Sequence, residues 1–189
     1  MSKGYALRGL TLIETLTCIA IIGITMTMAV PALTRFNERI RISRESAELH
    51  QAISLARSLA ITQRSRITLC PLSTRYECTR DWNQQLTAFN DSNSNRRVDA
   101  GETIYSSVSG ISHSGALRHF NSSVISFDER GFAGFHTGSL SLCHSNQGGN
   151  FSGSVFIISR NGRIRPGTDR NGDGLPETPN GKNIPCPST

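Results

Sequence analysis

The hydrophobic pattern divides the chain into a long apolar segment near its N-terminus and a polar remainder with short apolar runs. From Leu10 to Leu33 the sequence is almost continuously apolar, and Glu14 is its only charged residue. These 24 residues would span roughly 36 Å as an α-helix, which exceeds the bilayer core of about 30 Å. The pattern therefore predicts one membrane-spanning helix over residues 10–33.

A second helical segment is expected directly after the first. Small or apolar residues recur there at intervals of three or four, between Arg, Glu and Gln, which indicates an amphipathic helix over residues 34–66. Pro31 removes one backbone hydrogen bond and is expected to bend the helix where it leaves the membrane.

The rest of the chain has the pattern of a β domain. Short apolar runs alternate with Gly, Asn, Ser and Pro over residues 67–165, and strands are expected at 67–69, 86–89, 103–108, 123–127, 140–143 and 155–158. Trp82 is expected in the core, and residues 166–189 are expected to be loop. The predicted fold class is α+β, with a long N-terminal helix packed on an antiparallel β-sheet or sandwich.

Four of the five cysteines lie outside the apolar run, and an even set is typical of oxidising compartments. They allow three pairings. Proximity favours Cys70 with Cys78 and Cys143 with Cys186, which would tie the last segment to the sheet. A zinc site is the competing interpretation, but no Cys-x-x-Cys spacing occurs. We expect no metal and no cofactor.

Two rules disagree about the side of the membrane on which the domain lies. Four arginines follow the apolar run, whereas only Lys3 and Arg8 precede it, so charge counting would keep the domain in the cytoplasm. The cysteines favour the oxidising side. We therefore expect a single pass through the inner membrane with a periplasmic C-terminal domain.

The start of the apolar run carries a processing signal. Arg8-Gly9-Leu10-Thr11-Leu12-Ile13-Glu14 resembles the class III signal of type IV pilins and pseudopilins, in which Phe usually stands at the position of Leu10. The resemblance implies that a prepilin peptidase removes residues 1–9 after Gly9 and N-methylates Leu10. An acid within the membrane is costly unless it is paired. Glu14 is therefore the expected assembly residue, paired with the new amino group of Leu10 on its own or a neighbouring subunit.

The junction between the helix and the first predicted strand narrows the family. This segment resembles the FimT/GspH branch of minor pilins, and the residues that carry the resemblance are Leu49, Ala56, Arg57, Ala60, Arg64 and Ile67-Thr68-Leu69-Cys70. The resemblance implies incorporation into a pilus and association with other major and minor pilins.

The candidate site is Arg160-Asn161-Gly162-Arg163-Ile164-Arg165. Asn-Gly between two apolar stretches predicts a two-residue hairpin turn. The period of a strand then places Arg163 and Arg165 on one face, about 7 Å apart, with Ile164 toward the core. Two such guanidiniums could meet phosphates two nucleotides apart, since phosphates advance about 3.4 Å per nucleotide. Alternatively, the arginines only protect an edge strand from aggregation.

The same residues resemble a known motif. Gly162-Arg163-Ile164-Arg165 matches the Gly-Arg-x-Arg motif of FimT-type minor pilins that bind DNA during uptake. The resemblance implies double-stranded DNA as a partner, Arg163 and Arg165 as the contacts, and Gly162 as the residue that shapes the turn. Charge and proximity add further candidates, namely Arg160, Arg170 and Lys182.

The positive net charge of the chain is compatible with DNA as a partner but does not by itself show DNA binding. The formal net charge of +6 falls to +4 once Lys3 and Arg8 leave with the leader. No aromatic residue accompanies the Arg motif, so base stacking is not expected. Binding should be independent of sequence and sensitive to salt.

Two acidic loops, residues 91–102 and 169–174, partly match calcium-binding loops. In the first, Arg96 stands where Gly is needed; in the second, Asn180 stands where the bidentate Glu should be. Both are interpreted as Asx-rich turns.

No catalytic motif is present, and we do not expect an enzyme. The histidines are expected at the surface or in turns; they are His50, His113, His119, His136 and His144. The sequence thus predicts a minor type IV pilin that binds DNA for natural transformation. The alternative is a structural subunit, either a GspH-type pseudopilin of a type II secretion system or a minor pilin that primes pilus assembly.

Overall fold

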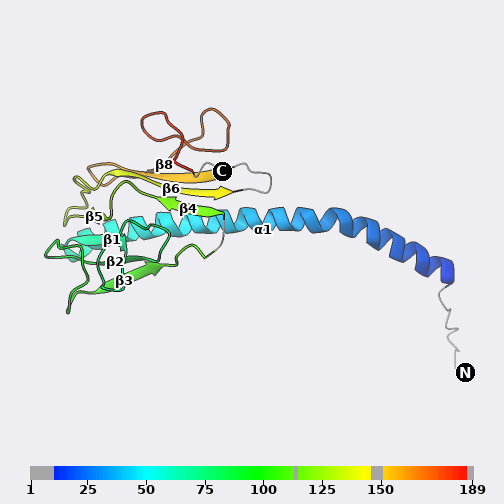
Figure 1. The fold of residues 1–189 in the computed structure, drawn as a ribbon, viewed down its shortest axis with the longest axis horizontal. Helices are drawn as coiled ribbons and strands as arrows, with labels where there is room; N and C mark the ends of the chain where they lie inside the picture. The colour runs from blue at the N-terminus through cyan, green and yellow to red at the C-terminus, as the bar shows by residue number, and fades with distance from the viewer. Residues whose placement is uncertain (1–10, 113–114, 146–150, 187–189) are drawn as a thin grey trace, which may run out of the picture. The chain divides into compact units, whose positions relative to one another are not determined.

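The computed structural model describes residues 11–112, 115–145 and 151–186. Within these ranges it has one long helix and eight strands (Figure 1). Their bounds are α1 Leu12–Gln63, β1 Ile67–Pro71, β2 Leu86–Asn90, β3 Ile104–Val108, β4 Ala116–His119, β5 Ile125–Phe127, β6 Gly138–Ser145, β7 Phe151–Ile158 and β8 Ile164–Pro166. Every strand pair is antiparallel, so the predicted α+β class is confirmed.

The chain divides into two compact units, residues 1–43 and 44–189, which are described separately. The first contains the apolar part of α1, the one helix in the described part that is long and apolar enough to cross a membrane. Pro31 lies inside α1, and the helix continues through it.

The first turn of α1 is capped by its own side chains. The backbone N–H of Glu14 donates to the Thr11 hydroxyl at 3.4 Å, and the backbone N–H of Thr11 donates to the Glu14 carboxylate at 3.4 Å. This reciprocal pair is a capping box, which satisfies N–H groups that have no partner within the helix. Glu14 therefore has a role within its own chain that the sequence analysis did not consider.

The second unit packs the C-terminal part of α1 with two four-stranded sheets. Their strand orders are β3-β2-β1-β5 and β4-β6-β7-β8. In the view of Figure 1, β2 and β3 lie below this part of α1, and β4, β6 and β8 lie above it. Leu49, Ile53, Ala56 and Ala60 form one completely buried helical face. This face shares a single core with residues of both sheets, such as Leu69 of β1 and Leu140 of β6.

The C-terminal segment covers the other face of the second sheet. Ile184 is 3% exposed and packs with Cys143, Val155 and Ile157 in a separate apolar cluster. Disulfides join Cys143 to Cys186 and Cys70 to Cys78, the pairing that proximity in the sequence favours. The expected loop is therefore fixed both by a covalent bond and by a buried side chain.

All six strands predicted from apolar runs occur, and β8 is the second strand of the predicted hairpin, but β4 was not predicted. Strand β4 has no apolar run that would predict it. Its Arg118 is buried, donates from its guanidinium to the carbonyl of Ser109 at 3.0 Å, and has its backbone N–H bonded to the Asn83 side chain at 2.8 Å. Hydrogen bonds to β6 and to these loop groups therefore hold a polar edge strand in place.

Two predictions about single residues have opposite outcomes. Trp82 is buried as predicted, and its indole N–H donates to the carbonyl of Ser122 at 2.8 Å. The surface prediction is wrong for His144, which is 2% exposed. It lies on the core-facing side of β6 with its Nε2 3.7 Å from the carboxylate of Glu45 in α1. A polar partner on the helix thus allows the imidazole to be buried.

Candidate nucleic-acid interface

The Arg motif lies on the hairpin that joins β7 to β8. The N–H of Ser159 donates to the carbonyl of Arg163 at 3.0 Å, and the N–H of Gly162 donates to the carbonyl of Ser159 at 2.9 Å. The loop therefore has three residues, 160–162. The predicted two-residue turn is wrong, because a type I′ turn needs positive φ at both central residues and only Gly162 has it, at +74°.

Gly162 shapes this hairpin through its lack of a side chain as well as through its φ. A Cβ at this position would collide with the carbonyl oxygen of Gly131 and lie 2.9 Å from Nε of Arg57. The hairpin thus packs backbone to backbone against the β5–β6 connection, which we define as residues 128–137.

Four hydrogen bonds hold the hairpin and the β5–β6 connection together. The carbonyl of Arg160 accepts the N–H groups of Ala133 at 2.9 Å and Gly134 at 3.1 Å. From α1, Arg57 donates to the carbonyls of Gly131 at 3.1 Å and Asn161 at 3.5 Å. The Arg motif is therefore fixed to the domain core before any ligand binds.

The two arginines of the motif are exposed at the edge of the second sheet. Arg165 is paired with Ile157 in the register of β7 and β8, and Ile164 is paired with Ile158 and packs against the main core, as predicted. Within the described ranges neither Arg163 nor Arg165 has a carboxylate within 4.0 Å. Both guanidiniums are thus open to an external anion.

Lys182 and Arg170 lie near opposite ends of β7. Lys182 closes a second three-residue hairpin loop, with the N–H of Thr178 donating to its carbonyl at 2.8 Å. Thr178 lines a groove of about 490 Å³ together with Ile157 and Ile158, so this hairpin lies near Arg165. Arg170 follows Asp169, which lines a different cavity beside Gly153 and Val155.

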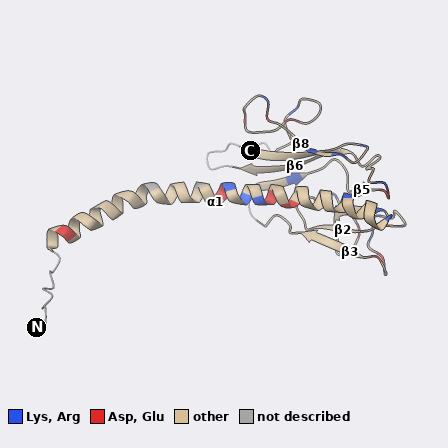
Figure 2. Ribbon diagram, turned by 180° about the vertical axis from the view of Figure 1, so that it is seen from behind, with Lys and Arg blue, Asp and Glu red and all other residues tan. Residues whose placement is uncertain are grey.

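Other loops bring additional arginines to the hairpin, and the sequence did not associate these residues with the motif. Burial chiefly, and then the nearby Arg96 and Arg66, lower the pKa of His136 in the β5–β6 connection, while Asp91 opposes them. Arg66 and Arg96 therefore lie close to the segment on which the hairpin packs. Arg130 lies in the connection itself and adds a third arginine to this region. Figure 2 marks the positions of Lys and Arg along the ribbon.

We define the basic loop surface as Arg66, Arg96, Arg130, Arg160, Arg163 and Arg165. In the part of the chain that the structure describes, no carboxylate lies within ion-pair distance of these side chains. Arg97 differs, since it lies 3.8 Å from Glu77 and 3.9 Å from Asp99. The sequence alone does not distinguish Arg96 from Arg97, because both are adjacent arginines in a loop that also contains several acidic residues.

An aromatic side chain also accompanies the hairpin, so the expectation of none is wrong. The guanidinium of Arg160 lies over the ring of Phe135, with 5.9 Å between Cζ and the ring centroid. The two residues are 25 positions apart in the sequence and are brought together by the Ala133 and Gly134 hydrogen bonds.

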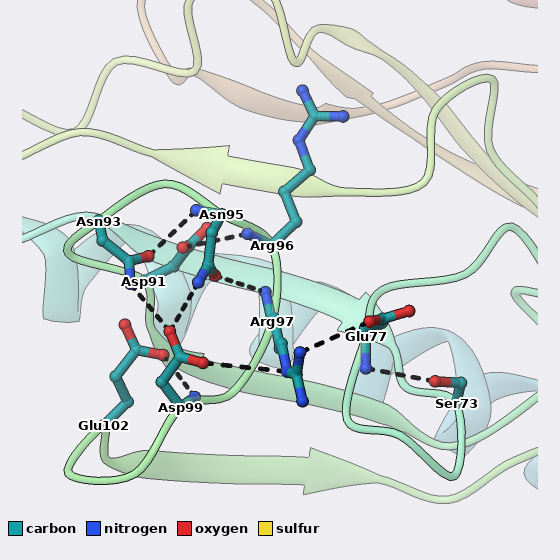
Figure 3. Close-up of polar contacts among 9 residues, drawn as sticks. All are labelled: Ser73, Glu77, Asp91, Asn93, Asn95, Arg96, Arg97, Asp99 and Glu102. Carbon is teal, nitrogen blue, oxygen red and sulfur yellow. Dashed lines mark hydrogen bonds and ion pairs between the residues drawn. The ribbon is translucent and has the colours of Figure 1, made fainter.

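The polar side chains of the loop 91–102 form hydrogen bonds with other groups of the same loop (Figure 3). Asp91 is buried and accepts the Thr68 hydroxyl at 2.7 Å and the N–H of Arg96 at 3.3 Å. Asp99 accepts the amides of Asn93 and Asn95, and these hydrogen bonds lower the pKa of its carboxyl. These carboxylate oxygens are engaged in hydrogen bonds within the fold, and the Asx turns are made by the side-chain oxygens of Asn93 and Asn95, which accept the N–H groups of Asn95 and Arg97.

The loop 169–174 is closed in a similar way. Asp169 accepts the N–H groups of Gly172 at 2.7 Å and Gly174 at 2.8 Å. The N–H of Leu175 and the amides of Asn183 and Asn171 lower the pKa of Asp173. Among the described residues, no group of three His, Cys, Asp or Glu side chains is arranged to hold a metal ion.

The remaining predicted site residues belong to the N-terminal region. Gly9 and Leu10 lie outside the described residues. Glu14 is exposed and makes the capping contacts given above.

Comparison with solved structures finds two crystal forms of the type IV minor pilin FimU from Pseudomonas aeruginosa strain PAO1. They are 23% and 22% identical to this chain, with TM-scores of 0.48 and 0.45. The matches cover 69% and 66% of this chain and 90% of each FimU chain. Comparison with curated protein sequences gave no match. Residues 45–162, more than half of the chain, match the family model of the type II transport protein GspH, and the chain therefore belongs to this family of pilin-like structural proteins, which are not enzymes.

Proposed function

We propose that this chain is a minor type IV pilin that binds double-stranded DNA without sequence preference and serves DNA uptake in natural transformation. The observation that carries the proposal is the β7–β8 hairpin with two exposed guanidiniums, Arg163 and Arg165, which have no carboxylate partner among the described residues. Arginine binds phosphate oxygens in pairs through its planar fork, and it is more weakly hydrated than lysine. Phosphate groups are the ligand that this arrangement suits best.

The rigidity of the hairpin supports the same proposal. Its loop is held by Gly131, Ala133 and Gly134 of the β5–β6 connection and by Arg57 of α1. A ligand therefore does not have to order this loop, and that part of the entropy cost of binding is avoided. Arg160 and Lys182 would extend the phosphate contact, and Arg170 would meet a more distant part of the same duplex.

The proposal includes an assembly step. Residues 10–33 would anchor the subunit in the inner membrane with the domain in the periplasm, and cleavage after Gly9 would expose the amino group of Leu10 for methylation. Glu14 would then bind the amino terminus of its own or a neighbouring subunit. The capping bonds of Glu14 are long, at 3.4 Å, and a charged partner would replace them readily. Family membership implies association with other pilins.

A structural role is the second candidate, because the family model that matches the chain is that of the type II transport protein GspH. In that case the chain would be a GspH-type pseudopilin of a secretion system, or a minor pilin that primes assembly. Strand β8 is an edge of its sheet, and Arg163 and Arg165 would serve only to block edge-to-edge aggregation.

Fluorescence anisotropy with a labelled DNA duplex separates the two candidates. The full-length protein in nonionic detergent would be compared with Arg163→Ala/Arg165→Ala and with Arg75→Ala/Arg80→Ala, which removes the same charge from exposed positions in the segment between β1 and β2. We expect only the first variant to weaken binding, and to reduce the slope of log K against log salt by about 1.8, at about 0.9 per lost phosphate contact. Equal weakening in both variants would place the contact elsewhere, and absence of binding at low salt would favour the structural role.

A further inference from the structure

We infer that Phe135 and Arg160 form a stacking platform for one unpaired base, so that the hairpin region binds single-stranded DNA or an unpaired DNA end in addition to duplex phosphates. The inference rests on the proposed DNA-binding function. It assigns to that site a substrate feature that the two arginines of the motif do not provide.

Phe135 is placed as an external contact residue. Its side chain is 92% exposed, the highest value for a large apolar side chain among the described residues. The segment around it is nevertheless anchored, since Ala133 is 2% exposed within the main core and His136 is half-buried, although Gly134 is exposed. The ring therefore projects from a segment that is otherwise held in the fold.

The backbone beneath the ring is fixed by hydrogen bonds. Ala133 and Gly134 both donate to the carbonyl of Arg160, and the N–H of His136 donates to the carbonyl of Ala133 at 2.9 Å. Gly134 has a φ of +55°, which completes the tight turn before Phe135. An aromatic ring on a fixed backbone loses little conformational entropy when it binds, because only its two χ angles are free.

Arg160 and Phe135 already contact each other, with the guanidinium over one face of the ring. The guanidinium carbon lies 5.9 Å from the ring centroid, within the range of a cation–π interaction. This contact uses one face of the ring, and the exposure of the side chain leaves area for a planar ligand. Stacking of a base on an aromatic side chain contributes about 1–3 kcal/mol and tolerates any base.

The charges around the ring favour nucleic acid over an apolar protein partner. Arg130 and Arg163 belong, like Arg160, to the basic loop surface, whose side chains have no carboxylate within 4.0 Å in the described part. A base stacked on Phe135 would carry its phosphates beside these guanidiniums. Inside a duplex both faces of a base are already stacked, so an unpaired base can use the ring without the unstacking cost that an internal paired base would require.

The test compares two probes of equal length, a labelled dT20 strand and a labelled 20-base-pair duplex, with the full-length protein in nonionic detergent. The variants are Phe135→Leu, which keeps an apolar side chain but removes the aromatic face, and Phe135→Trp, which keeps the face. We expect Phe135→Leu to weaken dT20 binding about 5- to 150-fold and duplex binding less than twofold, and Phe135→Trp to retain both. Trp82 fluorescence during urea unfolding of Phe135→Leu confirms that the domain is folded, because Trp82 is buried.

A second readout is specific to stacking. A 2-aminopurine base inside the single strand should be quenched on binding to the unaltered protein and not to Phe135→Leu. If duplex binds but Phe135→Leu leaves dT20 affinity within twofold and the quenching intact, the platform inference is refuted, the proposed function stands, and the exposed ring is assigned to a protein contact. If neither probe binds the unaltered protein, the proposed function fails and the inference fails with it.

Discussion

Replacement of Gly162 by Ala would test whether the hairpin is held by the close contact with the β5–β6 connection. Gly162 has a φ of +74°, and a Cβ there would collide with the carbonyl oxygen of Gly131. Gly181 provides a matched control. It has a φ of +72° in a loop of the same hydrogen-bonding pattern, and a Cβ there would meet nothing within 4 Å.

The two substitutions share one cost and differ in another. The left-handed backbone costs an Ala residue roughly 1–2 kcal/mol at either position. At Gly162 the hairpin must also move away from Gly131, which breaks the two hydrogen bonds that the N–H groups of Ala133 and Gly134 donate to the carbonyl of Arg160, each worth about 0.5–1.5 kcal/mol. We expect Gly162→Ala to lower the free energy of unfolding by roughly 2–5 kcal/mol and Gly181→Ala by roughly 1–2 kcal/mol.

Urea unfolding monitored by Trp82 fluorescence measures both values on the oxidised full-length protein. Trp82 is the only tryptophan and is 2% exposed, so its emission reports the unfolding of the domain. Equal destabilisation by Gly162→Ala and Gly181→Ala would refute the reasoning, because the packing against Gly131 would then contribute nothing beyond the strain of the backbone.

Three further predictions concern stability. The free energy of unfolding, measured with urea, should fall by about 4 kcal/mol in Cys143→Ser/Cys186→Ser and by about 2.5 kcal/mol in Cys70→Ser/Cys78→Ser, since the disulfides close segments of 43 and 8 residues. The reverse order would contradict the loop-entropy argument. Burial, and then Arg96 and Arg66, lower the pKa of His136 below its ordinary value of about 6.5, so the unfolded chain takes up this proton first as the pH falls. Urea unfolding at a series of pH values should show this contribution to stability present above about pH 6.5 and lost as the pH falls through the lowered pKa. The loss should be smaller in His136→Gln. Arg57→Met should destabilise by about 1.5–3 kcal/mol through the lost bond to Gly131, while the exposed control Arg75→Met should change stability by less than about 0.5 kcal/mol.

Hydrophobic periodicity was sufficient to predict the helix and the six strands that have apolar runs. It could not predict β4, because Arg118 and His119 carry no strand signal and their pairing partner, β6, lies more than 20 residues away. The same limit applies to His144, whose burial depends on Glu45 of α1. Contacts between distant segments decide both cases, and local sequence does not contain them.

The candidate site was only partly predictable for a related reason. The spacing of Arg163 and Arg165 identified the exposed arginines, but the loop length was predicted incorrectly because Asn-Gly also fits a three-residue loop. Phe135 lies 25 positions before Arg160, and the two side chains meet only through the docking of two loops. Thr11 and Glu14, in contrast, form a capping box that spacing alone could have indicated.

The Cys143–Cys186 disulfide has a mechanical consequence for a subunit that is pulled by a bound polymer. The bond encloses β7, the Arg hairpin and β8 in one covalent ring that returns to β6. Tension applied at Arg163 therefore reaches Cys143 along two chain segments in parallel, one backward through β7 and one forward through the C-terminal segment. Each segment bears part of the load, and a single cut in either leaves the hairpin still connected to the rest of the domain.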